Sequence, residues 1–139
     1  MRSPVFIDTS YVLALVNLGD EYHVRAAQAS EVVQPPFLTT EAVLVEIGNA
    51  LARARWRDLA VATIHDLRSD ASVEVVSVDT ALLERALALF EARYDKEWGL
   101  TDCISFVVMQ ERDLTYALTT DRHFVQAGFH SALADTRGT

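Results

Sequence analysis

Three aspartates follow apolar runs that have the length of β-strands, and they are the first candidates for chemistry. Asp8 comes directly after residues 5–7, whereas Asp79 and Asp121 follow runs at 73–76 and 114–118. Ligands of open α/β sheets bind at the carboxyl ends of parallel strands. Asp is also a favoured helix N-cap, so Asp79 is interpreted as a cap, and for Asp121 a cap and a ligand remain alternatives. Asp8 lies between two apolar runs, where an isolated charge is costly, so we expect a partner for it.

Two acids on predicted helices complete the set. Glu46 flanks an inward apolar stripe, with a solvated carboxylate as the alternative, and Asp102 falls in the first turn of a helix that begins at Thr101. Glu41 is also in a first turn and is interpreted as structural. Carboxylates gathered in one crevice repel one another unless a divalent cation neutralises them, and oxygen ligands select hard ions such as Mg²⁺. The acids that predict a magnesium site are Asp8, Glu46, Asp102 and Asp121.

Short apolar runs alternate with helical patterns, which is typical of an α/β domain with a mainly parallel sheet. The predicted strands cover residues 5–7, 37–38, 73–76, 114–118 and, at the edge, 129–133. Helices are predicted at residues 11–18, 22–33, 58–67 and 122–126. Three more are predicted from their first residues: one capped by Thr39 or Thr40, one opened by Asp79 and Thr80, and one that begins at Thr101. In the helix opened by Asp79 and Thr80, the residues predicted to face the core are Leu83, Leu87 and Phe90. We therefore expect one domain, residues 1–139, with a three-layer α/β/α fold.

Composition limits the function classes. The chain has 139 residues, half of them apolar, and a net charge of -8 from twenty acids against twelve Lys and Arg, unlike a passive nucleic-acid binder. No apolar stretch approaches the ~20 residues that cross a bilayer, and no signal-like segment opens the chain, so we expect a soluble cytoplasmic protein. The single cysteine, Cys103, is predicted to be a buried small residue.

Four segments, in order and spacing, resemble the PIN-domain nucleases. They are "FIDTSYVLAL", "TTEAVLVEIGNALAR", "YDKEWGLTDCISFVVMQE" and "ALTTDRHFVQAGF", which together extend over residues 6–129. The likeness is greatest to the small bacterial and archaeal members, which include VapC-type toxins. Gly99, where a serine is expected in such relatives, is the visible departure, and it is predicted to touch no ligand.

The resemblance implies a metal site of Asp8, Glu46, Asp102 and Asp121, with the hydroxyl neighbours Thr9, Ser10 and Thr120. It further implies a ribonuclease that depends on Mg²⁺ or Mn²⁺ and leaves 5′-phosphate and 3′-hydroxyl ends. A small antitoxin that blocks the site and a homodimer are also implied. One or two metal ions would make the attacking water more acidic and offset the charge on phosphorus, which is chemistry that a phosphodiester needs.

Basic residues near the site leave alternatives open. Arg53, Arg55 and Arg57 cluster near the end of the helix that carries Glu46, where they complement the helix dipole or contact RNA or an antitoxin. His123 is either a surface or capping residue or a phosphate contact.

Three further functions are weighed against a toxin nuclease. A phosphatase with an aspartate nucleophile usually carries a second aspartate two residues later, but Ser10 stands there. A housekeeping RNA-processing nuclease and a non-catalytic module that binds RNA or protein both remain compatible with the sequence.

Overall fold

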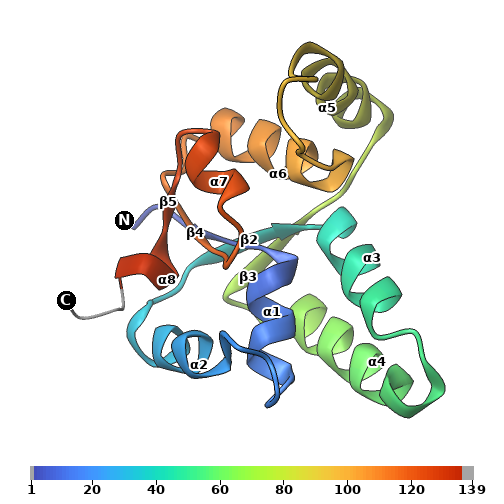
Figure 1. Ribbon diagram of the computed structural model, residues 1–139, viewed down its shortest axis with the longest axis vertical. Coiled ribbons are helices and arrows are strands. Elements are labelled where there is room, and N and C mark those ends of the chain that lie inside the picture. The colour runs from blue at the N-terminus through green and yellow to red at the C-terminus, as the bar shows by residue number, and fades with distance from the viewer. Residues whose placement is uncertain (1, 136–139) are drawn as a thin grey trace.

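A five-stranded, wholly parallel sheet forms the centre of the molecule. The computed structural model describes residues 2–135, with side chains to Leu133. The strands are β1 (Val5–Ile7), β2 (Phe37–Thr40), β3 (Val73–Val76), β4 (Tyr116–Leu118) and β5 (His130–Ser131), in the order β3-β2-β1-β4-β5. Figure 1 shows helices on both sides of this sheet, with α1, α2 and α4 below it and α5, α6 and α7 above it. The predicted three-layer α/β fold with a parallel sheet is confirmed.

The helices fall close to their predicted positions. They are α1 (Thr9–Val16), α2 (His23–Val32), α3 (Glu41–Ala50), α4 (Ala54–Ser69), α5 (Thr80–Ala92), α6 (Leu100–Glu111), α7 (His123–Gln126) and α8 (Ala132–Asp135). Thr40 rather than Thr39 caps α3, because its hydroxyl accepts from the Val43 N–H, 3.3 Å away. None of the described helices has the length and apolar character needed to cross a membrane.

β1 is central because its side chains are apolar towards both faces of the sheet. Phe6 is fully buried and is in register with Leu38 of β2 and Ala117 of β4. The backbone N–H of Asp8 donates to the Leu118 carbonyl at 3.0 Å, so the β1–β4 pairing continues to the point where β1 ends. The carboxylate of Asp8 is thereby held at the carboxyl edge of the sheet.

An aromatic cluster joins the elements around this edge. The Phe106 ring of α6 lies edge-on to Phe124 of α7, with centroids 4.9 Å apart, and Phe124 lies 6.0 Å from Phe6 of β1. Trp98, just before α6, packs on Phe106 at 5.0 Å and donates from Nε1 to Gln126. Burial of these rings fixes α6 and α7 against β1.

The predicted strand at 129–133 is present as β5 at the edge of the sheet, but it covers only His130–Ser131, after which the chain turns into α8. The predicted core face of α5 is wrong. The three residues expected to face the core from α5 are exposed: Leu83 (41%), Leu87 (51%) and Phe90 (44%). The helix contacts α6 and buries Leu82 and Ala86 instead. Two apolar stripes run along α5, one residue out of phase, and spacing alone does not distinguish them.

Candidate active site

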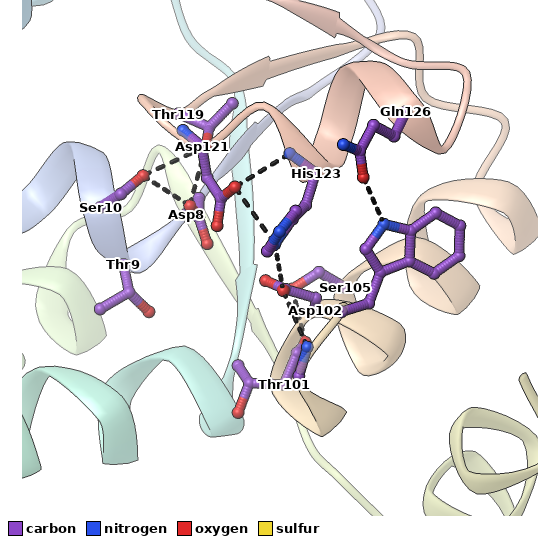
Figure 2. A network of polar contacts seen from close by, with 12 residues as sticks. Asp8, Thr9, Ser10, Thr101, Asp102, Ser105, Thr119, Asp121, His123 and Gln126 are labelled. Carbon is purple, nitrogen blue, oxygen red and sulfur yellow. Dashed lines mark hydrogen bonds and ion pairs between the residues drawn. The ribbon is translucent and has the colours of Figure 1, made fainter. Parts of the chain in front are cut away.

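Asp8 follows β1 and is almost completely buried, with 4% of its surface exposed. Its Oδ2 accepts two hydroxyl hydrogen bonds, from Ser10 Oγ at 2.6 Å and from Thr119 Oγ1 at 2.8 Å (Figure 2). No described residue donates to Oδ1, which is therefore left for a ligand in the adjoining cleft. Among the described residues, the side chains that meet the Asp8 charge are these two neutral hydroxyls, and none of them is a cation.

The pKa of Asp8 reflects this environment. The pKa is raised from 3.8 to about 6, mainly by burial and to a lesser extent by the nearby charges of Asp102 and Asp121, whereas the two hydroxyls oppose the shift. A carboxyl group with this pKa is charged at neutral pH at a considerable free-energy cost. A cation at Oδ1 would offset that cost.

Asp102 and Asp121 approach each other across His123. The Asp102 carboxylate accepts from the Gly99 N–H at 3.1 Å and from His123 Nδ1 at 3.0 Å. Asp121 accepts from the His123 backbone N–H at 2.9 Å and lies 3.2 Å from Nδ1 of the same residue (Figure 2). Burial, and then the Asp121 charge, raise the pKa of Asp102, whereas the Gly99 N–H and His123 lower it. One ligand atom from each of the three side chains lies within 4.8 Å of the others, which is compact enough to share an ion.

Glu46 enters the same space from α3. Its Oε1 accepts a 2.6 Å hydrogen bond from Thr9 Oγ1, so the side chain is held at the cleft instead of turning to solvent. A cleft of about 580 Å³ contains the whole acidic set, and its lining residues are Asp8, Thr9, Ser10, Leu13, Glu46, Asn49, Ala50, Asp102 and Asp121. Four carboxylates from four segments therefore line one cleft, and among the described residues the compact group within 4.8 Å is Asp102, Asp121 and His123.

Two other acids have the structural roles expected of them. Asp79 caps α5 by accepting from the Leu82 N–H at 2.8 Å, and Glu41 accepts from the Val78 N–H at 2.9 Å. Asp121 fits both alternatives, a helix cap and a metal ligand. Its carboxylate accepts from the backbone N–H of His123 at the start of α7, and the same side chain lines the cleft.

The sequence analysis names Thr120 as a hydroxyl neighbour of the site, but the threonine that donates to Asp8 is Thr119. Thr119 donates to Asp8 and accepts from the Asp121 N–H at 2.9 Å, so it links the two strand-end acids. Thr120 contributes its backbone N–H, which donates to Ser10 Oγ at 2.9 Å. Successive side chains of an extended segment point to opposite sides, so only one of two adjacent threonines can face Asp8.

Gly99 is closer to the site than expected. The departure from the family pattern was predicted to touch no ligand, but its N–H donates to Asp102. The backbone makes this contact, so it needs no side chain at position 99.

The arginine cluster begins a helix instead of ending one. Arg53 is the N-cap residue of α4, and Arg55 and Arg57 lie in its first turn. Complementarity to the helix dipole therefore does not explain them, because the N-terminus is the positive end. Arg57 donates from Nε and Nη2 to the Ala52 carbonyl at 3.2 and 2.5 Å, which closes the turn after α3.

The donor set suits a hard divalent cation. Carboxylate oxygens predominate, and Oδ1 of Asp8 has no hydrogen-bond donor among the described residues. Mg²⁺ typically takes one or two carboxylates and keeps several waters, for which a cleft of this size has room.

Comparison with known proteins agrees with this geometry. The family model described as PIN domain matches residues 5–130. The 23S rRNA-specific endonuclease VapC20 of Mycobacterium tuberculosis, in strains CDC 1551 / Oshkosh and ATCC 25618 / H37Rv, is 32% identical over 125 residues, covering 90% of this chain and 95% of the relative. The crystal structure of that species' VapC20, titled a Sarcin-Ricin loop cleaving toxin, superposes with a TM-score of 0.84 at 31% identity, covering 90% of this chain and 95% of the other. A toxin-antitoxin complex from Klebsiella pneumoniae shares the fold, with a TM-score of 0.60 at 18% identity over 85% of this chain and 87% of the other. The chain, which places four carboxylates in one cleft of this fold, belongs to the PIN domain family.

Proposed function

We propose that the chain is a metal-dependent endoribonuclease, active as the toxin of a toxin–antitoxin pair, that hydrolyses RNA phosphodiester bonds. The observation that carries the proposal is the gathering of Asp8, Glu46, Asp102 and Asp121 around one cleft, where one oxygen of the buried Asp8 receives no hydrogen bond from any described residue. A structural role does not explain so costly an arrangement. The relative VapC20 is named as an endonuclease, which supports RNA as the substrate.

Mg²⁺ is the proposed cofactor, with Mn²⁺ as a substitute, and Asp8, Glu46, Asp102 and Asp121 would hold it. When bound, such an ion makes a water nucleophile more acidic and stabilises the leaving 3′ oxygen. Ser10 and Thr119 hold Asp8 through its Oδ2, which would leave Oδ1 able to bind the ion.

Side chains around the acids orient them. Thr9 holds Glu46, and His123 keeps Asp102 and Asp121 close together. We assign the proton of the attacking water to a carboxylate of the same set, because His123, the histidine that contacts these acids among the described residues, directs its Nδ1 at Asp102 and Asp121.

The proposal extends to partners and organisation. We infer one nuclease domain over residues 1–139, a small antitoxin that blocks the cleft, cytoplasmic action on RNA, and a homodimer. The exposed Leu83, Leu87 and Phe90 of α5 support the dimer, because a row of large apolar side chains is a surface that a second copy can cover.

Cleavage by purified protein tests the activity. The substrate is an oligoribonucleotide stem–loop with the sarcin-ricin loop sequence, incubated with Mg²⁺ or with EDTA. We expect cleavage only with Mg²⁺, loss of cleavage in Asp8→Asn, and wild-type cleavage in Asp79→Asn, which changes an acid outside the cleft. Cleavage in EDTA, or full activity of Asp8→Asn, would contradict the proposal.

Expression in a bacterial host tests the toxin assignment. The wild-type chain should arrest growth, Asp121→Asn should not, and co-expression of a small reading frame adjacent to the gene should restore growth. Normal growth under strong expression of an active enzyme would favour the housekeeping alternative.

A further inference from the structure

The turn between α3 and α4 carries arginines that the fold does not use. Arg85, Arg93 and Arg112 each pair with a carboxylate, whereas Arg2, Arg68 and Arg122 are exposed and have no carboxylate partner among the described residues, but each stands singly in the sequence. In the part of the chain that the structure describes, Arg53 and Arg55 have no carboxylate partner, and both are exposed. The charge of these two guanidinium groups is therefore free to meet a ligand.

Their place in the fold is electrostatically unfavourable without such a ligand. The N-terminus of the 16-residue helix α4 is its positive end, and Arg53, its N-cap residue, makes no side-chain capping bond. Cations at this end lower the stability of the helix, whereas an anion bound there is stabilised both by the dipole and by the guanidinium groups. The arrangement thus favours an anionic ligand.

An exposed aromatic ring lies among these charges. Trp56 keeps 36% of its surface exposed, and the guanidinium of Arg55 lies 4.6 Å from the centre of its ring. Arg57 anchors the same turn to the Ala52 carbonyl, which limits its motion. An aromatic ring beside a guanidinium group is the combination on which proteins stack unpaired bases, so the ligand that fits is a single strand of nucleic acid.

The turn adjoins the acidic cleft. Ala50, the last residue of α3, lines the cleft, and Arg53 follows three residues later, within about 10 Å of extended chain. In Figure 1 the turn projects beyond the end of α3, away from the sheet. An RNA strand whose scissile phosphate lies in the cleft can therefore reach the turn within a few nucleotides. Because the chain has a net charge of -8, most of its surface repels RNA, and a local group of arginines would direct the strand to this turn.

We propose that Arg53, Arg55 and Trp56 form a docking surface for the RNA strand beside the cleavage site. The two guanidinium groups contact phosphates, and the Trp56 ring stacks on an unpaired base. This inference rests on the proposed function, because it assumes that the substrate in the neighbouring cleft is RNA. An acidic segment of a protein partner could pair with the arginines but would gain nothing specific from a flat ring, so RNA fits the surface better.

RNA binding without divalent cations tests the docking surface. The probe is a fluorescein-labelled stem–loop oligoribonucleotide with the sarcin-ricin loop sequence, followed by anisotropy in EDTA so that it stays intact. Trp56→Leu keeps an apolar side chain but removes the ring, and should weaken binding ~5- to 150-fold, the range expected for one stacked base. Trp56→Phe should retain most of the affinity.

The salt dependence of binding tests the phosphate contacts. The double variant Arg53→Gln/Arg55→Gln should reduce the slope of log K against log salt by about 0.7 for each lost contact. Arg68→Gln, in the last turn of the same helix, is the matched control and should leave the slope unchanged. Thermal melts monitored by circular dichroism should be cooperative for every variant.

Wild-type affinity in Trp56→Leu, or an unchanged salt slope in the double arginine variant, would overturn the docking surface. If Mg²⁺-dependent cleavage is normal while these variants bind like wild type, the docking surface alone fails. If the wild-type protein cleaves no RNA with Mg²⁺, the proposed nuclease fails, and the EDTA measurements still decide whether the surface binds RNA.

Discussion

Replacing Asp8 by Asn should make the metal-free protein more stable. Asn keeps the shape of Asp8, and its side-chain oxygen can still accept from Ser10 and Thr119. The substitution removes a charge that is almost completely buried and that is repelled by Asp102 and Asp121. Loss of a buried polar group normally destabilises a protein, so a gain in stability would identify the charge itself as the cost.

The raised pKa of Asp8 gives the size and the sign of the effect. A shift from 3.8 to about 6 penalises the charged form by roughly 3 kcal/mol. Between these values the folded chain binds more protons than the unfolded chain, so the free energy of unfolding falls as pH rises from about 4 to about 6, and above that range the full penalty remains. At about pH 7.5, the free energy of unfolding of Asp8→Asn should exceed that of the wild type by ~1–3 kcal/mol. Between about pH 4 and 6 it should fall much less steeply than that of the wild type.

Urea denaturation in EDTA measures the stability of the metal-free protein, and the same experiment in Mg²⁺ measures the stabilisation by the ion. Mg²⁺ at about 100 times its dissociation constant should stabilise the wild type by about 2.7 kcal/mol, a melting shift of several degrees for this chain length, and should stabilise Asp8→Asn less. Asp79→Asn is the control, because it replaces one good N-cap by another outside the cleft. An Asp8→Asn protein that is less stable than wild type in EDTA, with an unchanged Mg²⁺ shift, would refute the reasoning.

Three further predictions follow from single contacts. Thr119→Val should destabilise the metal-free protein by ~1–3 kcal/mol in urea denaturation, because Asp8 loses a donor and the Asp121 N–H its acceptor; an unchanged free energy of unfolding would contradict this role. His123→Ala should weaken Mg²⁺ binding ~10-fold or more in calorimetric titration, since the ring holds two of the acids, and equal affinity would show that it does not position them. Leu87→Glu should convert a dimer to a monomer in light scattering after gel filtration, and a dimer that persists would exclude this face of α5 as the interface.

The convergence of the acids was predictable because it depends on sheet topology. A strand followed at once by Asp8, and a later strand followed by Asp121, must end at the same edge if the strands are parallel and adjacent, as β1 and β4 are. Glu46 was predictable as a polar residue beside an apolar helix stripe. Conversely, the choice between Thr119 and Thr120 depends on which side of an extended segment faces Asp8, and two adjacent threonines carry no apolar pattern that could decide it.

The error on α5 has a different origin. Its apolar residues fill two stripes, and a pattern of hydrophobicity records only that both are apolar. The stripe of Leu82 and Ala86 packs on α6, whereas Leu83 and Leu87 stay exposed. A small residue such as Ala86 allows two helices to approach closely, which favours the stripe that contains it. The helix therefore leaves Leu83, Leu87 and Phe90 at the surface, where a partner could bury them.

The aromatic cluster explains how the fold can hold like charges together without metal. Each of three acids lies a few residues from a ring of this cluster on the same segment: Phe6 precedes Asp8, Phe106 follows Asp102 by one helical turn, and Phe124 follows Asp121. The rings contact one another, so moving apart the segments that carry the acids would require separating buried rings, which costs several kcal/mol of apolar burial. Repulsion among the acids thus cannot relax by moving the elements apart, and it adds to burial, the main cause, in raising the pKa values of Asp8 and Asp102. A rigid site that retains its repulsion in the metal-free state gains the most from binding a cation, because the cation removes that repulsion without reorganising the fold.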